Sequence, residues 1–80
     1  MANKRRIEIV KFLGKKGRAI VGDIAREIKL SFRSTSRHLA ILAAADILER
    51  NQHGLNAYYS INYNNKTARK IMSLLAFNPY

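Results

Sequence analysis

The sequence SFRSTSRHLAILAAA, residues 31–45, predicts a helix with two chemically opposed faces. Thr35, Leu39 and Leu42 recur at spacings of four and three residues, which places them on one apolar stripe of an α-helix. The opposite face carries arginines, short hydroxyls and a methyl group, and its members are Arg33, Ser34, Ser36, Arg37 and Ala40. No carboxylate follows until Asp46, so this face can approach a polyanion closely, and the pattern favours nucleic acid as the partner.

A shorter helix is predicted directly before this one. Residues 21–29, VGDIAREIK, place their apolar side chains at helical spacing, and the Ser31 hydroxyl can cap the helix over 31–45. About three residues, 29–31, connect the two helices, which is the length of the turn in a helix-turn-helix. The pair therefore predicts a helix-turn-helix.

Net charge supports the same class of partner. Fifteen Lys and Arg residues against five Asp and Glu residues give a formal charge of +10 at pH 7. Such a balance is typical of nucleic-acid-binding proteins, although a merely solvated basic surface is the alternative. Eighty residues suffice for a single domain, residues 1–80, with one small core of marginal stability.

Several other classes of function lack the residues that they need. The chain has no cysteine, which excludes disulfides, thiolate metal sites and cysteine nucleophiles. It also lacks paired carboxylates in an apolar setting, a Ser-His-Asp pattern and a phosphate-binding glycine loop. We therefore expect no enzymatic activity and no cofactor. Since no signal peptide and no apolar run of membrane-spanning length occurs, we expect a cytoplasmic protein without membrane contact.

The first and last predicted helices carry more apolar side chains than one small core requires. A helix over 3–13, ended by Gly14, is apolar around more than half its circumference, whereas a surface helix buries a narrower stripe. A last helix over 65–76, capped by Asn64 or Asn65, also has apolar residues outside its inward stripe. We predict a homodimer interface formed by Ile9, Phe12, Leu74 and Phe77.

Two β-prone runs follow the central helix and predict a hairpin over residues 47–63, with His53-Gly54-Leu55-Asn56 between the strands. Residues 19–21 predict a short additional strand, and 14–18, GKKGR, a basic loop. The hairpin side chains expected to contact nucleic acid are Arg50, Asn51, Gln52, His53 and Asn56. The loop side chains that would contact its backbone, unless the loop is only solvated, are Lys15, Lys16 and Arg18.

The predicted order of helix, short strand, helix, helix, strand, strand and helix is that of a winged helix-turn-helix, a mainly α fold with a small β-hairpin. From Gly22 to Ile61 the sequence resembles the arsenic-repressor (ArsR-type) family of dimeric transcription regulators, most densely in STSRHLAIL and YYSI. The resemblance implies a regulator of double-stranded DNA, a repressor, with the helix over 31–45 in the major groove. The residues that would contact DNA from this helix are Ser31, Arg33, Ser34, Ser36, Arg37 and His38.

Two departures from the family bear on metal binding. Metal-sensing members place Cys-x-Cys at the start of the second helix, where this chain has Ile20-Val21-Gly22. Other members bind zinc through His and Asp of the last helix, and this chain has neither there. A tetrahedral zinc site would lack ligands, so we expect a member without a metal site. A third departure is Asp46, which stands where the family tends to have glycine.

Two other functions of a winged helix stay open at this point, since the fold alone does not decide function. An RNA- or ribosome-associated protein would use exposed aromatic residues such as Tyr58 and Tyr63 on its sheet. A protein-interaction module would not need a charge of +10. The arginines and short hydroxyls of residues 31–45 favour the major groove of DNA, which admits a helix.

Overall fold

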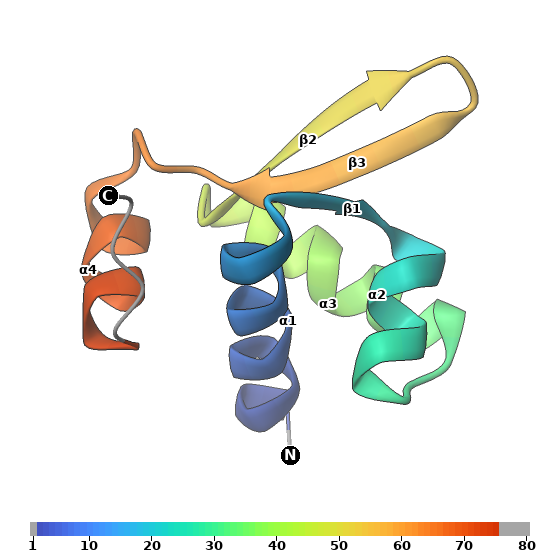
Figure 1. The fold of residues 1–80 in the computed structure, drawn as a ribbon, viewed down its shortest axis with the longest axis horizontal. Helices are drawn as coiled ribbons and strands as arrows, with labels where there is room; N and C mark the ends of the chain where they lie inside the picture. The colour runs from blue at the N-terminus through green and yellow to red at the C-terminus, as the bar shows by residue number, and fades with distance from the viewer. Residues whose placement is uncertain (1, 76–80) are drawn as a thin grey trace.

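The computed structural model describes residues 2–75. Its elements are α1 (Ala2–Lys16), β1 (Arg18–Ile20), α2 (Val21–Ile28), α3 (Phe32–Ala44), β2 (Leu48–His53), β3 (Asn56–Ile61) and α4 (Lys66–Leu74). This order confirms the winged helix-turn-helix predicted from the sequence (Figure 1). In Figure 1, α4 lies on the opposite side of α1 from α2, and the β2–β3 hairpin extends beyond the helices on the α2 side.

The three strands form one antiparallel sheet in the order β1-β3-β2. Ala19 pairs with Tyr59, and Leu48 pairs with Ile61. Because side chains alternate along a strand, these four residues face the helices and are buried, whereas Tyr58 is half-buried on the outer face. Side chains of β3 therefore alternate between the core and the outer face of the sheet, as expected for a strand with one buried face.

The core fills the space between this sheet and the helices. Ile9 and Leu13 of α1, Ile24 of α2, Leu39 of α3 and Met72 of α4 have almost no accessible surface. Burying a side chain of this size contributes about 1.5–3 kcal/mol relative to leaving it in water. Each of these four helices therefore supplies at least one large side chain to the core.

Helix α1 is longer than the sequence predicted. It continues through Gly14 to Lys16, and Gly17, with a φ of 93°, provides the left-handed residue after it. The Gly17 N–H donates to the Leu13 carbonyl at 2.8 Å. Glycine inside a helix costs about 1 kcal/mol, which is too little to end a helix whose adjacent residue, Leu13, is buried in the core. The expected helix end at residue 13 and the loop assignment of residues 14–16 are wrong.

The α2 helix ends in a Schellman motif that forms the turn of the helix-turn-helix. Lys29 is left-handed, with φ 56°. The Leu30 N–H donates to the Ala25 carbonyl at 3.0 Å, and the Lys29 N–H donates to the Arg26 carbonyl at 3.4 Å. The three residues 29–31 connect the helices, as the sequence predicted.

The α3 helix ends in the same motif, with Asp46 as the left-handed residue at φ 61°. The Ile47 N–H donates to the Leu42 carbonyl at 3.0 Å. The Asn62 side-chain amide, at the end of β3, donates to the Asp46 carbonyl at 3.0 Å. Asp46 thus holds a conformation that glycine adopts more easily, and a hydrogen bond from another element fixes it there.

We expect Asp46→Gly to raise the free energy of unfolding by about 1 kcal/mol, because glycine adopts the left-handed conformation without the steric cost of a Cβ. The Asp46 side chain is exposed, and the contact with Asn62 uses only the backbone carbonyl. Urea denaturation measures the change. Asp46→Ala is the matched control and should lower stability, since alanine keeps the Cβ. Equal shifts for the two variants would contradict the strain argument.

Candidate nucleic-acid interface

The exposed face of α3 is basic and free of carboxylates. Arg33, Arg37 and Ala40 are exposed along it, and Ser34 and Ser36 are half-buried at its two edges. Neither arginine has a salt bridge or a side-chain hydrogen bond to another of the residues 2–75. Two long donors therefore remain available for a ligand at the centre of this face.

The first turn of α3 is fixed by its own cap. The Ser31 hydroxyl oxygen accepts the Ser34 N–H at 3.1 Å, which confirms the predicted N-cap. The hydroxyl hydrogen of Ser31 is not used in this contact and can still be donated. The N-terminal end of α3 thus offers backbone N–H groups and a hydroxyl beside the arginines, a combination suited to phosphate.

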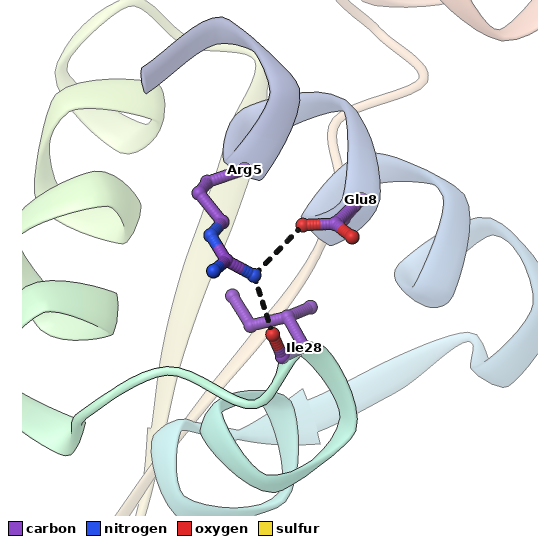
Figure 2. Close-up of polar contacts among 3 residues, drawn as sticks. All are labelled: Arg5, Glu8 and Ile28. Carbon is purple, nitrogen blue, oxygen red and sulfur yellow. Dashed lines mark hydrogen bonds and ion pairs between the residues drawn. The ribbon is translucent and has the colours of Figure 1, made fainter. Parts of the chain in front are cut away.

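Arg5 of α1 holds the turn that positions α3. Its guanidinium Nη1 donates to the carbonyl of Ile28, the last residue of α2, at 2.7 Å and to Glu8 Oε1 at 3.3 Å (Figure 2). A cation at the C-terminal end of a helix also interacts favourably with the helix dipole. Through this contact α1 fixes the end of α2, and with it the direction in which α3 leaves the turn.

His38 lies at the edge of the α3 face and is half-buried. Its Nδ1 is buried without a hydrogen-bond partner among the described residues. Burial lowers the pKa of His38, and the positive charges of Arg6, Arg37 and Arg5 lower it further. The lowered pKa therefore favours the neutral form of the side chain at pH 7 in the free protein.

This lowered pKa predicts an acid-sensitive contribution to stability. The unfolded chain binds the His38 proton more tightly than the folded protein does. The free energy of unfolding therefore rises with pH between the folded and the unfolded pKa of this residue. The contribution is complete above the unfolded pKa of about 6.5 and is lost as pH falls towards the folded value. We expect His38→Gln to flatten the pH dependence of urea unfolding below about pH 6.5. His53→Gln is the control, and an unchanged slope in His38→Gln would contradict the prediction.

The predicted hairpin residues divide between two faces of the wing. Arg50 and Gln52 lie on the face of β2 that continues the core side, because Arg50 pairs with the buried Tyr59. Asn51 and His53 lie on the opposite face. The sequence placed residues 53–56 between the two strands, but only Gly54 and Leu55 form the turn, since His53 pairs with Asn56.

Arg18 is part of the sheet rather than of a loop. Its guanidinium lies 4.7 Å from the centroid of the Tyr58 ring, and the His53 ring meets the same tyrosine edge-on at 5.7 Å. Cation–π contact of this kind holds the arginine over the outer face of the sheet. The structure therefore brings Arg18 together with a wing residue, a contact that the sequence did not indicate.

Lys15 and Lys16 lie on the last turn of α1, where both are exposed. They border shallow depressions between α1 and α2 that also contain Glu8, Asp23 and Glu27. The structure thus brings these two lysines together with carboxylates, and not with the arginines of α3.

The residues predicted for a dimer interface occupy different environments. Ile9 has no accessible surface and belongs to the core of its own chain, so its assignment to an interface is wrong. Phe12 packs partly against the core and faces α2. Leu74 is 78% exposed, and Phe77 lies outside the described residues. The apolar residues of α1 thus lie on more than one face of the helix. Their spacing in the sequence did not distinguish the face in the core from the faces outside it.

An apolar groove of about 400 Å³ runs between α1 and α4, closed at one side by the end of α3. Ile7, Val10, Leu42, Ile71 and Leu74 are among the residues that line it. Ile7, which is 46% exposed, was not singled out from the sequence. In Figure 1, α4 and α2 lie on opposite sides of α1, so the groove between α1 and α4 lies on the side of α1 away from α2.

Besides Ile7 and Ile41, two exposed apolar residues were not indicated by the sequence. Phe32, the first residue of α3, is 63% exposed, and Leu55 in the hairpin turn is 99% exposed. The only available signal was a large apolar residue directly after a helix cap and another within a two-residue turn, where polar residues are usual. Both lie in the helix-turn-helix and wing that the sequence assigned to nucleic acid.

Within residues 2–75, no cluster of three or more His, Cys, Asp or Glu side chains is placed to hold a metal ion. None of the helices described there is long and apolar enough to cross a membrane.

Comparison with known proteins decides the family. The sequence pattern of the family described as "Bacterial regulatory protein, arsR family" matches residues 3–50, from the first turn of α1 into β2. The chain belongs to the ArsR family. Its members are DNA-binding transcriptional regulators and not enzymes, so the ArsR resemblance and the absence of enzymatic function predicted from the sequence are confirmed.

Solved structures share the fold of this chain. The transcriptional repressor PagR of Bacillus anthracis is 36% identical, with a TM-score of 0.73 over 86% of this chain and 76% of PagR. A homodimeric winged helix-turn-helix domain of a possible ArsR-family regulator from Mycobacterium bovis is 24% identical, with a TM-score of 0.76 over 90% of this chain and 64% of that one. The Zalpha domain of PKZ from Carassius auratus, bound to Z-DNA, shares the fold at 23% identity, with a TM-score of 0.69 over 75% of this chain and 95% of that domain. A comparison with curated proteins found no match.

Proposed function

We propose that this ArsR-family protein is a homodimeric repressor that binds a two-fold symmetric site in double-stranded DNA, with α3 in the major groove. The observation that carries the proposal is the exposed face of α3, where Arg33 and Arg37 stand without carboxylate partners among the described residues. Arginine can donate two hydrogen bonds to guanine, and the major groove admits a helix. Two copies of α3 would then read half-sites about one helical turn apart.

The proposed DNA contacts come from three parts of the chain. From α3 and its cap they are Ser31, Arg33, Ser34, Ser36, Arg37 and His38. From the wing they are Arg50, Asn51, Gln52, His53 and Asn56, which would meet the phosphate backbone or the minor groove. Lys15, Lys16 and Arg18 would add contacts to phosphates. Because the wing residues occupy two faces, only one set of them can face the duplex on a given side of the hairpin.

Repression and independence from metals are part of the proposal. The relative with 36% identity, PagR, is a transcriptional repressor, which supports the same role here. The positions where other ArsR members bind metals hold Ile20-Val21-Gly22 and a last helix without His or Asp. We therefore propose that DNA binding responds to a signal other than a metal ion, or to protein concentration alone.

Selection of bound sequences from a random duplex pool, with chelator and with added zinc, tests the function. We expect a consensus of two inverted half-sites that is the same under both conditions. A pool without enrichment, together with binding to single-stranded or structured RNA, would overturn the proposal in favour of an RNA-associated winged helix. Enrichment only in the presence of zinc would show that a metal site exists after all.

A further inference from the structure

Leu55 is the most exposed of the large apolar residues in the described part of the chain. Its side chain is 99% accessible, at the end of the β2–β3 hairpin. The turn between two strands is ordinarily the place for Gly, Asn, Asp or Ser, which tolerate both the backbone conformation and water. A leucine there has no role in the fold of the free protein, since it contacts no part of the core.

The backbone that carries Leu55 is well defined by local contacts. His53 pairs with Asn56, so the turn contains only two residues. Gly54 has a positive φ of 62° and Leu55 does not, which is the pattern of a type II′ turn. Such turns match the twist of the strands beside them, so the tip is narrow and stiff.

Side chains brace this tip along one face of the wing. Arg50 Nη2 donates to Gln52 Oε1 at 3.0 Å, and Gln52 Nε2 donates to the Gly54 carbonyl at 3.0 Å. The Arg50–Gln52–Gly54 chain ties the turn to the strand. Leu55 is therefore presented on a preformed support, which limits the entropy lost if it binds a partner.

The apolar groove between α1 and α4 does not account for Leu55. Ile7 and Leu74 border that groove, whereas Leu55 is at the end of the hairpin that extends away on the other side (Figure 1). A single leucine is also too small to be a protein-docking patch. The same hairpin carries Arg50, Gln52 and Asn56, which are hydrogen-bonding residues suited to the sugar-phosphate backbone and to base edges.

We propose that Leu55 acts as an apolar wedge that enters the minor groove of the bound duplex and partly separates two stacked base pairs. Proteins that bind the minor groove use Leu, Ile, Phe, Met or Pro in this way and bend the duplex towards the major groove. This inference rests on the proposed function, because it requires α3 to place the wing against DNA. It adds a source of sequence preference, since pyrimidine–purine steps unstack more easily than other steps.

Fluorescence of 2-aminopurine placed beside the expected step of the selected site reports unstacking, and energy transfer between the duplex ends reports bending. We expect wild-type protein to increase both signals. Leu55→Asn should lose both and bind a site with a pyrimidine–purine step about tenfold more weakly, a loss similar to that from one mismatched base pair. Leu55→Met, which keeps an apolar side chain, should retain them.

The outcomes separate the wedge from the proposed function. Specific binding by the wild type without unstacking or bending would overturn the wedge and leave DNA recognition by α3 in place. Equal signals from wild type and Leu55→Asn would also overturn it. If the wild type bound no duplex, both the wedge and the proposed function would fall.

Discussion

Arg37→Ala is expected to weaken binding to the selected DNA site by about 1–3 kcal/mol, roughly 5- to 150-fold, because that is the discrimination from one arginine bound to guanine. Arg37 is exposed near the middle of α3, one turn after Arg33, and its guanidinium has no carboxylate partner among residues 2–75. Affinity for random duplex should change far less, since non-specific binding comes from phosphate contacts. Titration of labelled duplexes at several salt concentrations measures both.

Lys16→Ala is the control for this experiment. Lys16 lies on the last turn of α1 and is proposed to contact phosphate, so its loss should weaken specific and random duplex equally. The negative slope of log affinity against log salt concentration should become less steep by about one. Should Arg37→Ala behave in the same way, Arg37 would be a phosphate contact. If neither Arg33→Ala nor Arg37→Ala changed binding to any duplex, recognition of DNA by α3 would be excluded.

The features that could be predicted from the sequence depend on residues close together in the chain. The stripe of Thr35, Leu39 and Leu42 is buried as the helical period requires. The caps Ser31 and Asn65 each accept an N–H from three residues further on, at 3.1 and 2.9 Å. A cap and a helical stripe are decided within one or two turns, so no knowledge of tertiary structure was needed.

The features that could not be predicted depend on which element packs on which. Helix α1 is apolar over most of its circumference, and periodicity alone could not show that Ile9 faces the core while Ile7 borders the α4 groove. The end of α1 also depended on packing, because burial of Leu13 outweighs the helix penalty of Gly14. In the same way, the contact of Arg18 with the ring of Tyr58 depends on the pairing of β1 with β3, which the sequence did not reveal.

The wing shows how one local detail controls the site. The sequence placed four residues, 53–56, between the strands, and a loop of that length leaves the faces of the flanking residues undefined. The structure has a two-residue turn, so strict alternation assigns Arg50 and Gln52 to one face and Asn51 and His53 to the other. Only one of these two sets can face DNA on a given side of the hairpin, so the candidate site contains fewer residues than the sequence predicted. Leu55, in the turn, is the most exposed large apolar residue in the described part of the chain.

The free protein is expected to be a homodimer that buries the groove between α1 and α4. Ile7 and Leu74 are large, apolar and exposed at this groove, and isolated monomers rarely leave such a surface in water. A second copy of the chain is the occupant, because the proposed homodimer needs a self-complementary apolar surface and this groove supplies one. A symmetric interface would also place two copies of α3 for two half-sites.

Leu74→Asp should dissociate this dimer, because it would bury an unpaired carboxylate in each copy of the groove, at a cost of about 3–5 kcal/mol or more. Leu74 is 78% exposed within one chain, so the monomer should still fold. Sedimentation equilibrium at micromolar concentration should give twice the chain mass of 9.1 kDa for wild type and the single mass for Leu74→Asp. Leu55→Asn, a change at an exposed leucine on the other side of the molecule, is the control and should stay dimeric. A monomeric wild type, or a Leu74→Asp variant that stays dimeric, would exclude this groove as the dimer interface. If Leu74→Asp but not Leu55→Asn lost binding to the site with two half-sites, the groove would be linked to DNA recognition.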